Sequence, residues 1–158
     1  AGCLGKDPDS PVFVKQRVVG STHKSKRAET SFFPLLSKNG FTLCSVVTKT
    51  GRKHQIRVHA QSAGFPLVGE KLYGADEEYY LEFCRNGWRE EWLPVLGMRR
   101  QALHARTFGF VDDGPSFVAS LPGDFLAFLT DRLELESNCE ALLEDKARIW
   151  TEAQFRGE

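Results

Sequence analysis

The stretch TGRKHQIRVHAQSAGFPLVGEKLYG, residues 50–74, is the most informative part of this chain. Together with the lysine before it, the stretch concentrates basic side chains within residues 49–59, which are Lys49, Arg52, Lys53, His54, Arg57 and His59. It then continues into small residues, glycine and proline. Such a local excess of cations attracts polyanions, and nucleic acid is the obvious candidate.

The middle of this stretch has the spacing of a short helix. Apolar, small and histidine side chains recur at intervals of three and four residues, at Ile56, His59, Ala60 and Ala63. Gly64 stands where the glycine after a helix belongs, and Pro66 follows two residues later. A strand with Ile56 and Val58 facing inward is the alternative, but the glycine and proline favour a helix.

The two histidines and the glycine of the stretch do not form a standard metal or nucleotide motif. His54 and His59 are five residues apart, which separates them by roughly 140° around a helix, so we expect no metal site. Gly51 is a single glycine without the P-loop pattern. If the helix begins just after it, free N–H groups flanked by Arg52 and Lys53 would still attract phosphate.

Arg57 lies between Ile56 and Val58, which draw this segment toward the core. An arginine in this position is expected to be partly buried and to need an anionic partner. The nearest acids in the sequence are Glu29 and Glu70. One interpretation is a structural ion pair with one of these glutamates; the other places Arg57 beside a catalytic carboxylate or a phosphate.

The residues before this stretch predict antiparallel strands. Residues 12–19 are rich in β-branched side chains, and residues 41–48 alternate as a strand does. Asn39-Gly40 precedes the second run and is a strong hairpin signal. The first fifty residues are therefore expected to form antiparallel sheet.

After the stretch, the pattern changes several times along the chain. Residues 75–100 combine acids, aromatic residues and a turn at Asn86-Gly87, which indicates an irregular or helical excursion. Beyond it we expect strands at 102–111 and 116–120, a turn at 112–115, and helices at 121–133 and 137–155. The predicted class is α+β, a mostly antiparallel mixed sheet with a few packed helices.

Composition narrows the setting. The 158 residues suit one domain, and no apolar run is long enough to cross a membrane. Four widely spaced cysteines and no sign of a secretory leader indicate reduced thiols in the cytoplasm. The net charge is zero, but residues 1–60 carry eleven Lys and Arg against three acids, and residues 111–158 carry four against eleven. The basic front of the chain again indicates nucleic acid.

At this point the motifs resemble a known family, the RluA-like RNA pseudouridine synthases. That family carries TGR-x-HQIRVH followed by G-x-P-(I/L)-x-GD-x-x-YG, which residues 50–74 match with Glu70 in place of the usual Asp. RRQALHARTFGFV resembles its R-x-x-LHA strand, and LPGDFLAFL resembles its closing helix. LGKDPDSPVFVKQRVV and KRAETSFFPL are similar to its preceding strands. The similarity covers most of residues 1–133.

The resemblance implies isomerisation of uridine to pseudouridine in tRNA or rRNA, with no metal or organic cofactor. A flipped target nucleotide is attacked by an Asp, and the Arg of the HQIR motif, here Arg57, ion-pairs with that Asp. Arg52, Lys53, His54 and Gln55 are implied as RNA-binding residues. The HRLD-like segment that carries the nucleophile is absent from these 158 residues. We therefore expect the chain to be part of a catalytic domain and to be inactive alone.

Two other functions remain open from the sequence. A non-catalytic RNA-binding relative would show salt-sensitive binding without chemistry. An anion-binding α+β domain with a structural arginine cluster is the third interpretation. In every case we expect residues 1–133 to form the domain, residues 75–100 to be an insertion, and residues 134–158 to form a helical extension.

Overall fold

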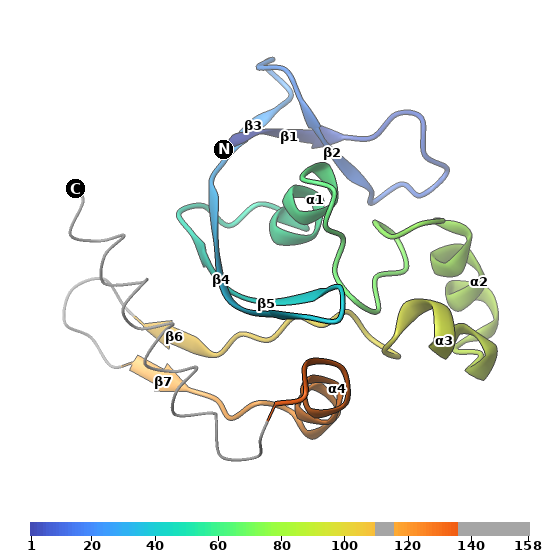
Figure 1. The fold of residues 1–158 in the computed structure, drawn as a ribbon. Helices are drawn as coiled ribbons and strands as arrows, with labels where there is room; N and C mark the ends of the chain where they lie inside the picture. The colour runs from blue at the N-terminus through green and yellow to red at the C-terminus, as the bar shows by residue number, and fades with distance from the viewer. Residues whose placement is uncertain (110–115, 136–158) are drawn as a thin grey trace.

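A computed structural model describes residues 1–109 and 116–135 (Figure 1). Sheets and helices are mixed in it, which confirms the predicted α+β class. None of the helices in these ranges is long and apolar enough to cross a membrane. The elements are β1 Gly2–Lys6, β2 Gln16–Val19, β3 Lys26–Ala28, β4 Thr30–Lys38, β5 Phe41–Thr48, α1 Gln55–Ser62, α2 Glu78–Asn86, the 3-10 helix η1 Glu90–Trp92, α3 Leu93–Leu96, β6 Thr107–Gly109, β7 Ser116–Val118 and α4 Gly123–Leu133.

The strands pair antiparallel, as predicted, but they form separate small sheets rather than one. The first sheet has the order β2-β1-β3, and β4 pairs with β5. The strand expected at 12–19 begins only at Gln16. Before it, the chain turns, because the N–H of Lys15 bonds to the carbonyl of Val12 and Val12 is buried in the core. A turn anchored by the buried side chain of Val12 therefore replaces the first half of the predicted strand.

The hairpin predicted at Asn39-Gly40 joins β4 to β5. Both residues have positive φ, 50° for Asn39 and 79° for Gly40, which matches the twist of a tight two-residue hairpin. A register shift between Pro34 and Leu36 interrupts the ladder. Proline has no N–H to donate, and so tolerates such a break.

The helix predicted after residue 54 is α1, which excludes the strand alternative. Gly64, with a φ of 83°, stands just beyond its end, as expected. Its buried face differs from the predicted stripe: Val58, His59 and Ala60 are buried, whereas Ala63 is exposed. Val58 turns inward because it packs into the core that Leu4, Ala28, Leu72 and Tyr73 also form.

A second core cluster lies around α4, which was predicted at 121–133. Phe125, Leu129 and Leu133 are the buried residues that α4 contributes, beside Met98 and Leu135, and side chains of β4 and β5 pack against the cluster. Phe41 and Phe128 meet edge to face with 5.3 Å between ring centroids. Figure 1 shows α4 on the opposite side of the β4-β5 ribbon from α1.

The excursion at 75–100 is folded and largely helical. It contains α2, η1 and α3, and Gly87 ends α2 where a turn was predicted. Glu77 ties the excursion to the loop after β1, because it accepts hydrogen bonds from Ser10 (2.6 Å) and Lys15 (2.7 Å). The strands predicted on either side of residues 112–115 are observed as the short pair β6-β7. The turn at 112–115 and the helix at 137–155 lie outside the described residues.

Candidate active site

The loop before α1 is held in place by Gln55. Its side-chain amide donates to the carbonyl of Glu29 and to the hydroxyl of Thr30, both at 2.9 Å. Its amide oxygen accepts from the hydroxyl of Thr50 (2.7 Å) and from the N–H of Arg52 (3.0 Å). One buried side chain therefore links β4, the end of β5 and the loop that carries the cations.

The predicted RNA-binding residues thus occupy different environments. Arg52 and Lys53 are exposed, and the Nε of Arg52 donates to the carbonyl of Arg27. Gln55 is buried, with hydrogen bonds on both ends of its amide within the chain. Exposure suits the two cations to contact RNA, whereas the observed contacts of Gln55 support the loop. The RNA-binding role of all four residues stays a prediction.

Arg57 points from α1 to Glu70 and forms a two-pronged ion pair with it. Nε lies 2.7 Å from Oε2, and Nη2 lies 2.6 Å from Oε1. The side chain of Glu70 is 1% exposed, and that of Arg57 is 15% exposed. The first interpretation of Arg57, a pair with a nearby glutamate, describes this structure. A nucleophilic Asp as a further partner stays a prediction.

Glu70 lies in a tight turn that aims its carboxylate. Oε1 also accepts the backbone N–H groups of Leu72 (2.9 Å) and Tyr73 (3.3 Å). Gly69 has a φ of 73°, and a Cβ there would lie 1.9 Å from the carbonyl oxygen of Arg100. A Cβ on Gly74 would lie 2.4 Å from the carbonyl oxygen of Glu70. The two glycines therefore permit the close backbone contacts that fix the turn.

The ion pair holds both charges despite burial. Burial by itself raises the pKa of Glu70, but the hydrogen bonds and charge of Arg57 and the N–H groups of Leu72 and Tyr73 outweigh it, so the pKa falls below its usual range. Burial likewise opposes the charge of Arg57, and Glu70 overcomes it and raises the pKa of the guanidinium. Both groups are therefore ionised at neutral pH.

His54 precedes α1 in the left-handed conformation, with a φ of 55°. Its Nδ1 lies 2.8 Å from the hydroxyl of Tyr73. Burial, followed by the positive charges of Arg57 and Lys53, lowers the pKa of His54 against the opposing effect of Glu70. The imidazole is therefore neutral at pH 7.

His59 belongs to the core and lies apart from this group. Its Nδ1 is 2.8 Å from the hydroxyl of Thr30, and its Nε2 is buried without a hydrogen bond. Across residues 1–109 and 116–135, no cluster of three His, Cys, Asp or Glu side chains could hold a metal ion.

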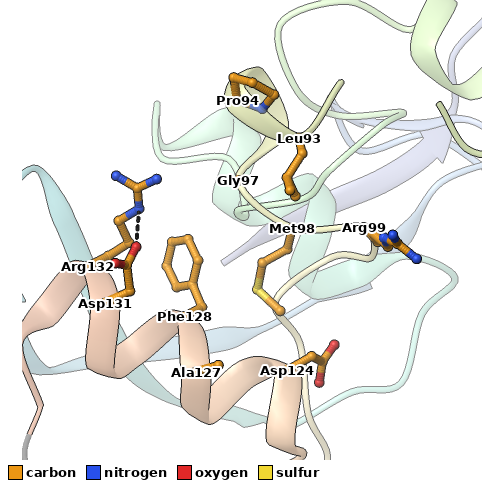
Figure 2. A pocket seen from close by; sticks show the side chains of 10 residues that line it. All are labelled: Leu93, Pro94, Gly97, Met98, Arg99, Asp124, Ala127, Phe128, Asp131 and Arg132. Atoms are coloured by element: carbon orange, nitrogen blue, oxygen red, sulfur yellow. Dashed lines mark ion pairs between the residues drawn. The ribbon is translucent and has the colours of Figure 1, made fainter. Parts of the chain in front are cut away.

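A hollow between α3 and α4 lies elsewhere and includes none of residues 49–59 (Figure 2). Its floor is apolar, with Met98 and Phe128. The charged side chains on its rim have partners within the chain: Arg99 with Glu90, Arg132 with Asp131, and Asp124 with Arg100. It therefore offers less to an anion than the group around Arg57.

The sequence did not reveal the part played by Tyr73. Its ring lies 4.9 Å from the guanidinium carbon of Arg57, and its hydroxyl bonds to His54. Its position three residues after Glu70 could have indicated this part, because a tight turn brings a residue at that spacing back beside the glutamate. The sequence did name Glu70 as a possible partner of Arg57.

Comparison with known families supports the resemblance. The model of the family described as RNA pseudouridylate synthase matches residues 8–62, which include the first half of the group just described. The chain is therefore related to the RNA pseudouridine synthases.

Individual relatives agree. The chain is 33% identical over 125 residues to the uncharacterized RNA pseudouridine synthase YjbO of Bacillus subtilis, covering 77% of this chain and 36% of the relative. It is 31% identical over 102 residues to the ribosomal large subunit pseudouridine synthase D of Zymomonas mobilis, covering 65% and 29%. A similar match, 44% over 63 residues, is to synthase C of Buchnera aphidicola, covering 40% and 20%. The resemblance to the RluA-like synthases is confirmed, and the chain spans about a third or less of these relatives.

Proposed function

We propose that this chain is part of the catalytic domain of an RNA pseudouridine synthase, which isomerises uridine to pseudouridine in tRNA or rRNA in the cytoplasm. The observation that carries the proposal is the fixed guanidinium of Arg57 beside the exposed cations Arg52 and Lys53. The relatives' names support the same activity. No metal or organic cofactor is part of the proposal.

The geometry leaves Arg57 able to serve a second carboxylate. A guanidinium has five N–H donors, and Glu70 occupies Nε and one hydrogen of Nη2. The remaining donors belong to Nη1 and to the other hydrogen of Nη2. The proposed nucleophile, an Asp from a preceding segment of a longer protein, would use this edge. Arg57 would keep that Asp ionised and aimed at the nucleoside.

In the proposed reaction the carboxylate attacks the flipped nucleoside and the bond from N1 to the sugar breaks. The uracil then turns and bonds through C5 to the same sugar carbon, which releases the carboxylate. N1 takes up a proton and C5 loses one, so no oxidant or reductant is needed. Arg52 and Lys53 are proposed to contact RNA phosphate, His54 to contact the RNA directly, and Gln55 to hold their loop.

The test is pseudouridine formation by the longer protein with uridine-containing tRNA and rRNA. Arg57→Ala should lose most activity, at least about a hundredfold, because the nucleophile loses its charge partner. Arg57→Lys should stay impaired, since a lysine cannot form the two-pronged contact. The matched control is Arg132→Ala, which removes an exposed arginine from α4 that pairs with Asp131.

Wild-type turnover in Arg57→Ala would overturn the role of Arg57. Salt-sensitive RNA binding without pseudouridine in the longer protein would instead favour a non-catalytic RNA-binding relative. The exposed cations Arg52 and Lys53 are the observation behind that alternative, since they suit RNA phosphate whether or not chemistry follows.

A further inference from the structure

Tyr73 lies at the centre of the candidate site, although nothing in the motif comparison gives it a task. The residue is completely buried in the core cluster beneath α1. Its hydroxyl oxygen accepts the backbone N–H of Gln16 at 3.0 Å and lies 2.8 Å from Nδ1 of His54. A buried phenol of this kind joins strand β2 to the residue that precedes α1.

These two contacts favour one arrangement of the protons on Tyr73 and His54. The N–H of Gln16 is a donor, so of the two partners of this buried hydroxyl only Nδ1 of His54 can accept its proton, and the geometry favours that donation. Nδ1 must then be an acceptor, which places the histidine's proton on Nε2. The charged groups around the imidazole are Lys53, Arg57 and Glu70. Two of these three are positive, which further disfavours a second proton on the ring.

The ring of Tyr73 contacts the other members of the site. The guanidinium carbon of Arg57 lies 4.9 Å from its centroid, within the range of a cation–π contact. The ring of His54 meets it edge on, with centroids 5.6 Å apart at 79°. Its backbone N–H donates to Glu70, the partner of Arg57. His54 and Arg57 thus contact the side chain of Tyr73, and Glu70 is bound by its backbone.

We propose that Tyr73 is a positioning residue, which fixes His54 as a neutral Nε2–H donor and seats the guanidinium of Arg57 over its ring. Nε2 of His54 has no hydrogen bond within the described residues and is not one of their buried unpaired atoms, which are His59 Nε2 and Trp88 Nε1, so it is open to a ligand. The ligand of that donor is an oxygen acceptor of the bound RNA, which rests on the proposed function. A neutral donor adds a directed hydrogen bond, whereas Arg52 and Lys53 add charge.

Histidine ¹⁵N NMR of the full-length protein tests the assignment without any chemistry, with His54 identified by its loss in His54→Gln. In the wild type we expect the Nε2–H tautomer and a pKa below 6.5. Tyr73→Phe keeps the ring and removes the donor, so the pKa of His54 should rise and the tautomers should mix.

Tyr80→Phe is the matched control, because Tyr80 packs against the same core cluster without bonding to His54. An Nδ1–H tautomer in the wild type would overturn the proposal even if Tyr73→Phe failed to fold. An unchanged His54 spectrum in a folded Tyr73→Phe protein would overturn it too.

RNA binding separates this proposal from the proposed function. Tyr73→Phe should weaken binding of a uridine-containing single strand about three- to tenfold and leave the salt dependence unchanged. Lys53→Ala should instead reduce the slope of log affinity against log salt by about 0.7. Wild-type affinity in Tyr73→Phe would overturn the claim that the positioned donor meets RNA. No RNA binding by the wild type would overturn the proposed function, while the NMR result would still decide the role of Tyr73.

Discussion

The turn that carries Glu70 and the helix α2 both join acids to arginines, but they do so in different surroundings. The Arg57–Glu70 pair is 15% and 1% exposed and is supported by backbone N–H groups. On α2, Arg85 reaches Glu78 and Glu82 with its side chain 58% exposed. Arginine–glutamate pairs are therefore fixed and desolvated in one region and solvated in the other. Burial of the partner, more than the presence of charge, separates the two.

The largest difference between the regions should appear when an acid is removed. Glu70→Ala leaves Arg57 charged, largely buried and without its partner, so we expect a loss of about 3–5 kcal/mol in the free energy of unfolding. Chemical denaturation measures this loss. The double variant Glu70→Ala, Arg57→Met should recover part of it, since the uncompensated charge is gone. A loss no larger than that of an exposed acid would show that the pair is solvated after all.

The region of α2 and η1 should depend on aromatic packing in place of charge. Trp92 is buried and meets both Tyr79 and Trp88 edge to face, with 5.5 Å between centroids in each case. Trp92→Leu should lower the free energy of unfolding by about 1–3 kcal/mol, because both contacts and part of the buried area are lost. Thermal unfolding gives the value. An unaffected melting temperature would mean that this region does not unfold with the rest.

Acid should weaken the site region by a smaller amount. The pKa of Glu70 in the folded protein lies below its unfolded value, so the pair stabilises fully above the unfolded pKa of about 4.3. That stabilisation is lost as the pH falls through the lower folded pKa. The loss should be smaller than in Glu70→Ala, because a protonated carboxyl still accepts the two N–H groups. Unfolding measured from neutral pH downward should show a steeper decline in the wild type than in Glu70→Gln.

The smallest effect should come from removing the exposed ion pairs that Arg85 forms on α2. Arg85→Ala removes two exposed ion pairs, and we expect its unfolding curve to overlay that of the wild type. Denaturation at low and high salt checks this, since screening should not change the result. A clear loss in the free energy of unfolding that high salt abolishes would show that these ion pairs act as a network.

Much of the fold could be predicted from sequence because the signals were local. Asn39-Gly40 set the hairpin through its two positive φ values, and Gly64 marked the end of α1. The predicted start of β2 was wrong, because a turn from Val12 to Lys15 precedes the strand and buries Val12. A run of β-branched residues does not show where the chain reverses its direction. The division into separate sheets depends on contacts distant in sequence, which periodicity cannot supply.

The candidate site was predictable to a similar degree. The need of a part-buried arginine for an acid pointed to Glu29 and Glu70, and the structure selects Glu70. The environment of Gln55 could not be inferred, because its partners Glu29 and Thr30 lie just before β4 and at its start, far away along the chain. Tyr73 was missed for the same reason, since its contacts to Gln16 and His54 join segments far apart in the chain.

The left-handed backbone conformation of His54 sets the stability of the protein against the proposed role of the imidazole. A residue other than glycine in this conformation costs about 1–3 kcal/mol, which the hydrogen bond to Tyr73 helps to offset. Glycine would adopt the same φ without strain but would remove the imidazole. Selection of variants for heat resistance alone would therefore favour glycine here and discard the side chain that the proposed function requires. An engineer who wants a more stable protein that keeps the proposed function should leave this position unchanged.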